Sequence, residues 1–279
     1  MSLTDRRVRI VEHPLTPRLT QVRRVERLTP AMVRVTLGGP ALDGFREMAP
    51  ADHVKLYFAQ GDDPVPVAPI IRDDRWEDPP PGAPDPVLRD YTVRYHRPGL
   101  RELDIDMVLH GDGPGSSFAA RARPGDLVGV LGPRGSEIVP LVFDWYLLGC
   151  DETGLPALGR WLEALPAGAR AFAYCEVAGA EERQALGSDA DAEVTWLHRD
   201  GAAPGRSDVL ARAVRAFAPP GGDGYAWFGG EATALKPVRR HLRNELGMPK
   251  ERVDVDGYWK VGVADHDHHD RDDHDGGLG

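Results

Sequence analysis

Cysteine is almost absent from this chain. Of its 279 residues only Cys150 and Cys175 are cysteines, and both lie in apolar runs. Two such residues do not make a disulfide framework, so we expect reduced thiols and a cytoplasmic protein. They are also too few to hold an iron–sulfur cluster. Any one-electron chemistry would therefore need another cofactor.

Long apolar runs and an excess of positive charge are also absent. No apolar run approaches the roughly 20 residues of a membrane helix, so we expect no membrane insertion. The formal charge is −10, from 34 Lys and Arg against 44 Asp and Glu. Residues 264–279 supply half of it, because they hold six Asp and one Arg. The remainder is only mildly acidic, which argues against general nucleic-acid binding.

The same segment, 264–279, is an Asp, His and Gly tract that cannot build a core, and we expect it to be disordered. Its histidines could bind a divalent metal loosely, but a solvated tail is the simpler interpretation, and we assign no metal site. These histidines are His266, His268, His269 and His274.

Residues 18–140 read as an antiparallel β-barrel. Short segments with alternating apolar and polar residues predict strands, and one helix is expected at 118–122. The strands are expected at 19–28, 32–37, 53–58, 90–97, 103–110 and 127–131. About six short strands with one helix are typical of a small barrel. We expect a loose arm at 1–17 and an irregular surface insertion at 60–88, which is rich in Pro, Asp and Gly.

Residues 141–263 follow a different pattern, in which predicted strands alternate with predicted helices. Strands are expected at 143–148, 169–177, 193–197, 224–228 and 253–259, and helices at about 155–165, 180–186, 207–217 and 231–246. This alternation predicts a doubly wound parallel sheet of the nucleotide-binding kind. The predicted architecture is therefore a barrel domain followed by an α/β domain.

Two segments of the predicted barrel could hold a phosphate-bearing planar cofactor. In the strand containing Arg89, Tyr91 and Thr92, the ring could stack on a flavin and the guanidinium could pair with a diphosphate. The turn Gly111–Ser117 lies between a strand and a helix, where free N–H groups can seat a phosphate. An exposed basic edge strand and an ordinary N-capped helix are the structural alternatives.

In the α/β half, candidate residues follow the predicted strands, where ligands bind in such sheets. Asp151, Glu152 and Thr153 follow the first strand, although the fingerprint GxGxxG is absent. Arg199 follows the third strand and could pair with the 2′-phosphate of a dinucleotide, or be a solvated surface residue. Glu231 opens a helix after two glycines. Cys150 reads as a small buried residue rather than a nucleophile.

Taken together, these elements resemble the siderophore-interacting protein family, the flavin-dependent ferric-siderophore reductases of the ferredoxin-reductase-like superfamily. The resemblance runs along most of residues 18–262. It rests on the motifs RDYTVR at 89–94, LDID at 103–106 through HG at 110–111, GPGS at 113–116, PGD at 124–126, GPRGS at 132–136, DWYLL at 144–148, DET at 151–153 with LPA at 155–157, and GYWKVG at 257–262.

The resemblance implies that the barrel binds FAD and that the α/β domain takes NADPH or NADH, with Arg199 tilting the choice towards NADPH. It implies that Arg89, Tyr91, Thr92 and Val93 line the flavin. The diphosphate and ribityl chain would lie along His110, Gly111, Gly113 and Ser116. The nicotinamide would approach Asp151, Glu152 and Thr153. Glu231, after the fourth strand, is a further candidate for binding a cofactor.

The implied activity is NAD(P)H-dependent reduction of ferric siderophores, with release of Fe(II). An anionic ferric siderophore needs a basic pocket beside the flavin, for which the candidates are Lys55, Arg134 and Arg240, with Arg239 and Lys260 in reserve.

We expect a monomer. Two alternatives remain: a general flavin or electron-transfer reductase with another acceptor, and a non-redox siderophore-binding accessory protein. The family usually has Gly at the position of Cys150, Ala at that of Gly154 and Trp at that of Phe118.

Overall fold

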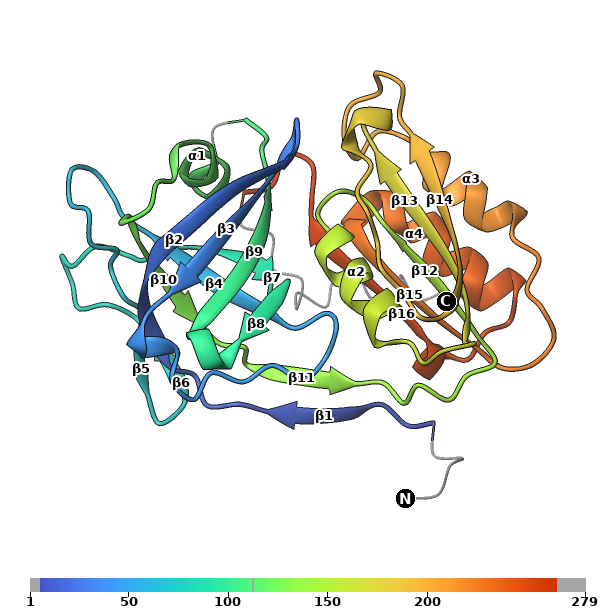
Figure 1. The fold of residues 1–279 in the computed structure, drawn as a ribbon, viewed down its shortest axis with the longest axis horizontal. Coiled ribbons are helices and arrows are strands. Elements are labelled where there is room, and N and C mark those ends of the chain that lie inside the picture. The colour runs from blue at the N-terminus through green and yellow to red at the C-terminus, as the bar shows by residue number, and fades with distance from the viewer. Residues whose placement is uncertain (1–5, 112, 265–279) are drawn as a thin grey trace.

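The computed structural model describes residues 6–111 and 113–264, which form two domains side by side (Figure 1). The first is built on a seven-stranded antiparallel sheet that curls into a barrel. Its strands are, in spatial order, β7 (Val87–Thr92), β4 (His53–Phe58), β10 (Leu127–Leu131), β2 (Pro17–Thr29), β3 (Met32–Gly38), β9 (Glu102–Val108) and β8 (Tyr95–Arg97).

The barrel core follows from the alternation of apolar residues along these strands. In β4, Val54, Leu56 and Phe58 point into the core and are almost fully buried. The helix α1 (Pro114–Arg121) packs on the barrel, where the rings of Phe58 and Phe118 lie 5.3 Å apart. Short 3₁₀ turns, η1 (Pro40–Leu42) and η2 (Pro98–Leu100), join the strands.

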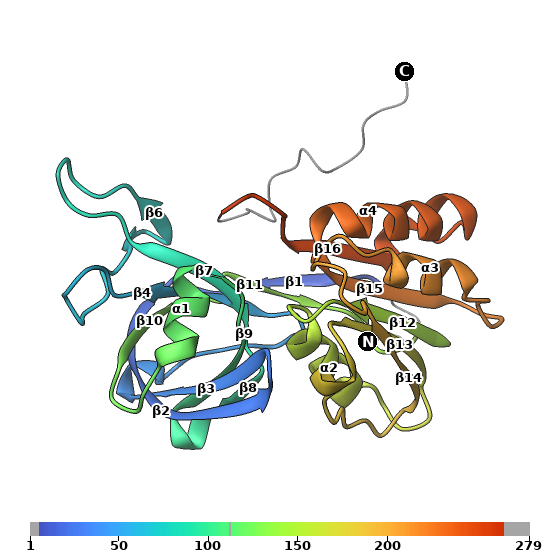
Figure 2. The same cartoon turned by 90° about the horizontal axis from the view of Figure 1, so that it is seen from above.

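The second domain is a five-stranded parallel sheet. Its order is β14 (Asp191–His198), β13 (Arg170–Val177), β12 (Trp145–Cys150), β15 (Gly224–Glu231) and β16 (Val253–Trp259). Helix α2 (Leu155–Ala164) covers one face, while α3 (Val209–Ala216) and α4 (Ala232–Arg240) cover the other (Figure 2). The central strands β12 and β15 are therefore buried on both sides, as their continuous apolar sequences require. The predicted fold class is confirmed.

Several elements differ from their predictions. The strand expected at 90–97 is two strands, β7 and β8, because the chain leaves the ladder at Val93 and Arg94. There the N–H of Val93 bonds to Asp52 O and that of Arg94 to Asp104 O. The helix expected at 180–186 is a single 3₁₀ turn, η3 (Ala180–Glu182). The helix expected at 231–246 is α4 followed by the π-helical segment η4 (His241–Glu245), and η5 (Lys250–Arg252) precedes β16.

The predicted insertion and the predicted arm both contain regular structure. Within 60–88 lies a hairpin of β5 (Ile70–Arg72) and β6 (Arg75–Glu77). The expectation of a loose arm was wrong from residue 9 onward, because β1 (Arg9–Glu12) pairs with β11 (Gly135–Ile138). The tail expected to be disordered lies, from residue 265 onward, outside the described residues.

A buried polar network fixes the arm to the barrel. Ser136 Oγ donates to Asp52 Oδ2 at 2.6 Å, which leaves its oxygen to accept from His13 Nε2 at 2.8 Å. All three side chains are buried. Because the serine proton goes to the aspartate and not to the histidine, this trio is not a nucleophile with its base. Its effect is structural.

The two domains are held together by charged contacts. Arg94 Nη2 and Nη1 donate to the two carboxylate oxygens of Glu163 in α2, at 2.6 and 2.9 Å. The Tyr95 hydroxyl donates to the same carboxylate, and Arg160 of α2 donates to Val93 O at 3.0 Å. Arg94 thus belongs to the domain interface. Within the residues described, no helix is long and apolar enough to span a bilayer.

Candidate functional site

The edge strand β7 carries the first part of the candidate site. Among the strands of the described residues it pairs only with β4, so one side of its backbone is not used by the sheet. Tyr91 points to the first turn of α1, and a Cβ built on Gly115 would lie 2.1 Å from the Tyr91 hydroxyl. Only glycine allows this close approach. Burial raises the pKa of Tyr91, so the phenol stays neutral.

The turn after β9 carries the second part. Gly111 has a φ of 46°, a conformation that favours glycine. Helix α1 begins without a side-chain cap, and Ser116 Oγ instead accepts from the N–H of His110 at 2.7 Å. A Cβ built on Gly113 would meet only His110, at 3.8 Å. The turn is thus open, with uncapped N–H groups, as a bound diphosphate requires.

The carboxyl end of β12 carries the third part. Asp151 is buried, and burial raises its pKa. Its Oδ1 accepts from the N–H and hydroxyl of Thr153, while its Oδ2 accepts from Glu231 N at 3.0 Å and Trp259 Nε1 at 2.8 Å. Both carboxylate oxygens therefore accept hydrogen bonds from within the domain, and Asp151 holds the ends of β12, β15 and β16 together.

Glu231 also has a structural use. Its Oε2 accepts from Ala234 N at 2.6 Å, which caps α4, and its Oε1 accepts from Val261 N at 3.1 Å. The side chain is 3% exposed. It therefore holds the start of α4 and the segment after β16 beside the strand ends.

Arg199 does not lie free in the position expected for a phosphate ligand. Its two terminal nitrogens donate to Glu152 at 2.8 and 2.6 Å, and Glu176 lies 3.8 Å away. The Arg199 side chain is only 3% exposed. Burial raises the pKa of Glu176 to about 7, with Arg199 opposing the shift. The prediction that Arg199 binds a 2′-phosphate is thus not supported, because its charge already neutralises buried carboxylates.

Tyr258 and Trp259 at the end of β16 complete this edge of the sheet; the sequence showed them as part of the motif at 257–262 but did not assign them to the site. The ring of Tyr258 lies beside that of Trp227, with centroids 6.4 Å apart, and burial raises the pKa of Tyr258. The Thr92 hydroxyl of β7 opposes this shift in pKa. The barrel edge and the α/β domain meet directly after β7, where Arg160 of α2 donates to the carbonyl of Val93 at 3.0 Å. Because β16 runs parallel to β15, its last residues lie at the edge of the sheet where ligands bind, and this position could have indicated them from the sequence.

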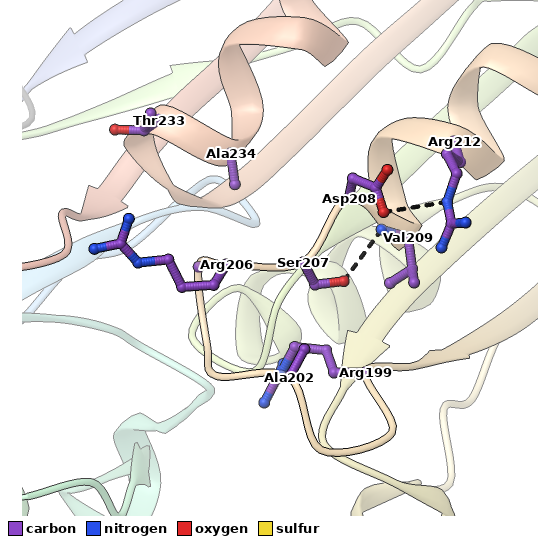
Figure 3. A pocket seen from close by; sticks show the side chains of 10 residues that line it. Arg199, Ala202, Arg206, Ser207, Asp208, Val209, Arg212, Thr233 and Ala234 are labelled. Atoms are coloured by element: carbon purple, nitrogen blue, oxygen red, sulfur yellow. Dashed lines mark hydrogen bonds and ion pairs between the residues drawn. The ribbon is translucent and has the colours of Figure 1, made fainter.

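A pocket of about 370 Å³ opens further along the same edge, between the starts of α3 and α4 (Figure 3). Arg199 lies on its floor, whereas Arg206 extends from the loop before α3. Arg206 is exposed. Arg212 pairs with Asp208 at 3.2 Å, and Thr233 stands at the start of α4. The pocket thus offers exposed guanidinium groups next to two helix N-termini.

Comparisons with known proteins fit this two-domain arrangement. Residues 21–137 match the family model of the siderophore-interacting FAD-binding domain, and residues 143–262 match that of the siderophore-interacting protein. A ferric vibriobactin reductase of Vibrio cholerae is 32% identical, over 91% of this chain and 93% of its own. This chain belongs to the siderophore-interacting protein family. The barrel is accordingly its FAD-binding domain.

Further members of the family support the assignment. The NADPH-dependent ferric-chelate reductase of Escherichia coli is 36% identical, over 93% of this chain and 99% of its own. The crystal structure of a siderophore utilization protein from T. fusca superposes with a TM-score of 0.88 at 48% identity, covering 94% of this chain and 99% of that one.

The departures from the usual family residues at 150 and 154 are explained by packing. A Cβ on Gly154 would lie 2.6 Å from the Cβ of Cys150 and 2.6 Å from Gly229 O. The larger residue at 150 therefore requires the smaller one at 154. Cys150 is fully buried and faces Cys175 across the β12–β13 pair, and burial raises the pKa of its thiol well above the ordinary value. It is a packing residue, as the sequence indicated.

The flavin candidates of the barrel are placed together, with one exception. Arg89, Tyr91 and Thr92 lie on β7, next to the turn that holds Gly111, Gly113 and Ser116. The Val93 side chain, in contrast, has no exposed surface and packs in the barrel core. It cannot line a cofactor through its side chain.

The basic residues predicted to receive the substrate are only partly gathered. Lys55 lies on β4 and binds Asp90 of β7 at 2.8 Å. Arg134 lies in the loop after β10, whose last residue, Leu131, is the strand partner of Lys55, and its side chain donates to Asp74 O. Arg240, however, ends α4, about 12 Å along the helix from the strand ends at its start. The expected triad is therefore not present.

Proposed function

We propose that this chain is an NADPH-dependent, FAD-containing reductase that releases iron from ferric siderophores as Fe(II). The observation that carries the proposal is the hydrogen bond from Arg160 of α2 to the carbonyl of Val93, directly after β7, at 3.0 Å. It joins the flavin-binding edge of the barrel to the helix that follows the end of β12, where a parallel sheet binds its nucleotide. An electron donor and a flavin bound at these two sites would be adjacent.

FAD supplies the change from a two-electron hydride donor to one-electron steps, which amino-acid side chains cannot provide. The protein would bind and orient it. Arg89 can pair with the diphosphate, the Tyr91 ring can pack against the isoalloxazine, and the Thr92 hydroxyl can bond to its polar edge. The uncapped start of α1, with Gly111, Gly113 and Ser116, would seat the phosphates.

The nicotinamide would approach Asp151, Glu152 and Thr153 at the end of β12. The charges of the two acids are taken up within the domain. Glu152 is neutralised by Arg199, and both oxygens of Asp151 accept hydrogen bonds from Thr153, Glu231 N and Trp259. Their role would be to hold the backbone of the strand ends in place.

For the 2′-phosphate we propose Arg206 in place of Arg199. The E. coli relative is named for its use of NADPH, and the pocket in Figure 3 would place an adenosine phosphate between exposed Arg206 and Arg212. Arg206→Ala should raise KM about tenfold for NADPH and leave KM for NADH unchanged, since a charge-assisted hydrogen bond contributes about 1.5 kcal/mol. Arg215→Ala, on the same helix α3, is the control. Equal changes for both nucleotides would exclude a phosphate contact.

The substrate would approach Lys55 on β4, which pairs with β7, and Arg134 in the loop that follows β10. Iron would leave because siderophores hold Fe(II) far less tightly than Fe(III), so the protein needs no iron ligands of its own. We also propose that the chain acts as a monomer in the cytoplasm.

The proposal is tested by anaerobic rapid mixing. NADPH should bleach the flavin absorption of the FAD-loaded protein. Mixing the bleached protein with a ferric catecholate should restore the colour much faster than mixing with the iron-free catecholate. Equal rates with and without iron would refute the assignment of the substrate.

A further inference from the structure

The β5–β6 hairpin projects from the barrel beside β7 (Figure 2). Its strands are joined by Asp73 and Asp74, whose φ values of 49° and 58° make the tight two-residue turn preferred in hairpins. None of the site residues predicted from sequence lies in it.

The hairpin carries two arginines opposite each other. Arg72 and Arg75 are cross-strand partners, so their side chains leave the same face. Arg72 pairs with Glu77 at 3.2 Å, at an exposed position. Arg75 is exposed and makes no ion pair within residues 6–111 and 113–264. Glu77 offsets the charge of Arg72 alone, so the two like charges still oppose each other across the hairpin, and a further anion between them would be stabilising.

A third guanidinium fixes the turn in place. Arg134 Nη1 donates to Asp74 O at 2.9 Å, and Asp74 Oδ1 accepts from Leu15 N at 3.2 Å. The turn therefore rests against the loop that follows β10, and this loop begins next to Lys55. The two arginines of the hairpin flank this turn, so they lie close to Arg134, one of the two basic residues that the proposed function assigns to the substrate.

The sheet face beneath leads to the redox site. In β4, Lys55 alternates with the core residues Val54 and Leu56, so it points outward, as does its partner Asp90 in β7. Thr92 follows Asp90 on the same outer side of β7, directly before Val93, whose carbonyl accepts from Arg160 of the α/β domain. The outer face of β4 and β7 therefore leads from Lys55 to the boundary with the α/β domain, where the flavin is expected to meet the nicotinamide.

We propose that the β5–β6 hairpin is the outer wall of the substrate site, where Arg72 and Arg75, together with Arg134, bind an anionic ferric tris-catecholate. This inference rests on the proposed function. Such a chelate is anionic because its phenolate oxygens carry more negative charge than Fe(III) carries positive. A ferric tris-hydroxamate is neutral, so the charges of the arginines should not increase its affinity. Guanidinium forks fit paired oxygen acceptors and are weakly hydrated.

The test compares the two chelates in anaerobic steady-state assays with NADPH and FAD-loaded protein. For the Arg72→Ala/Arg75→Ala protein, KM for ferric tris-catecholate should rise about tenfold at low salt, with kcat unchanged. KM for a ferric tris-hydroxamate should stay constant. The difference should shrink at high salt, because exposed charges are screened. Arg46→Ala, at another exposed arginine of the barrel, should change neither.

The outcomes separate this inference from the function on which it rests. If the wild-type protein reduces neither chelate, the proposed function fails. If the wild-type protein reduces both and the double variant retains the wild-type KM for tris-catecholate, the hairpin is not part of the substrate site. Equal losses for the anionic and the neutral chelate would also overturn the inference, since a charge effect cannot produce them.

Discussion

Gly115→Ala is the sharpest perturbation of the predicted flavin site. The added methyl group would lie 2.1 Å from the Tyr91 hydroxyl and 3.0 Å from its Cζ, whereas ordinary contacts begin at 3.4 Å. Tyr91 or the first turn of α1 must therefore move by about 1.3 Å. Both belong to the proposed cofactor site. Overpacking of this size costs about 1–3 kcal/mol, so FAD should bind roughly 5- to 150-fold more weakly.

The same turn provides the control. Gly113 has a φ of −63°, and a Cβ there would meet only His110, at 3.8 Å. Gly113→Ala should therefore keep the FAD affinity within a few-fold of wild type. Because the worst contact of Gly115→Ala is with a hydroxyl oxygen, adding Tyr91→Phe should recover part of the loss.

The assay is titration of FAD into flavin-free protein, followed by quenching of flavin fluorescence, with thermal unfolding measured in parallel. Tight FAD binding by Gly115→Ala would refute the placement of the cofactor on the surface that Tyr91 and the start of α1 form together. A loss that Tyr91→Phe does not recover would show that the variant acts through general unfolding of the barrel.

Three further changes test the packing around the site. Burial raises the pKa of Glu176 from its ordinary 4.5 to about 7, so its stabilising contribution is present below pH 4.5 and lost as the pH rises to 7. The free energy of unfolding of Glu176→Gln, measured in urea, should therefore rise by about 1–2 kcal/mol relative to that of wild type between pH 5 and 8. Parallel pH profiles of the two proteins would contradict this. Glu163→Ala leaves buried Arg94 without its bidentate partner and should cost about 1–3 kcal/mol, more than Glu163→Gln, and equal losses would argue against a charge effect. Gly154→Ala should lower the Tm less in a Cys150→Gly background than alone, and additive shifts would exclude the packing of the pair.

Much of this fold could be predicted because its signals are local. Alternation of apolar residues is set within each strand, and a buried parallel strand such as β12 reads as a continuous apolar run. The turn at Gly111 and Gly113 was also visible, since glycines between a strand and a helix have few other uses. These features need no knowledge of the tertiary partners.

The failures concern residues whose role depends on distant partners. Arg199 follows a strand, as a phosphate ligand would, but its charge is neutralised by Glu152, which lies 47 positions away in sequence. Arg94 and Arg89 look alike in sequence, yet only Arg94 meets Glu163 across the domain interface. Sequence periodicity cannot reveal such pairs, because it reports burial and not the identity of the partner.

The central claim is that electrons from NADPH reach iron held by a siderophore. The direct measurement is anaerobic turnover of the FAD-loaded protein with NADPH and excess ferric catecholate, with a ferrous-specific dye to trap the product. About two Fe(II) should appear for each NADPH consumed, because NADPH donates an electron pair and each ferric ion takes one electron. NADPH oxidation without trapped Fe(II), under strict exclusion of oxygen, would contradict the account.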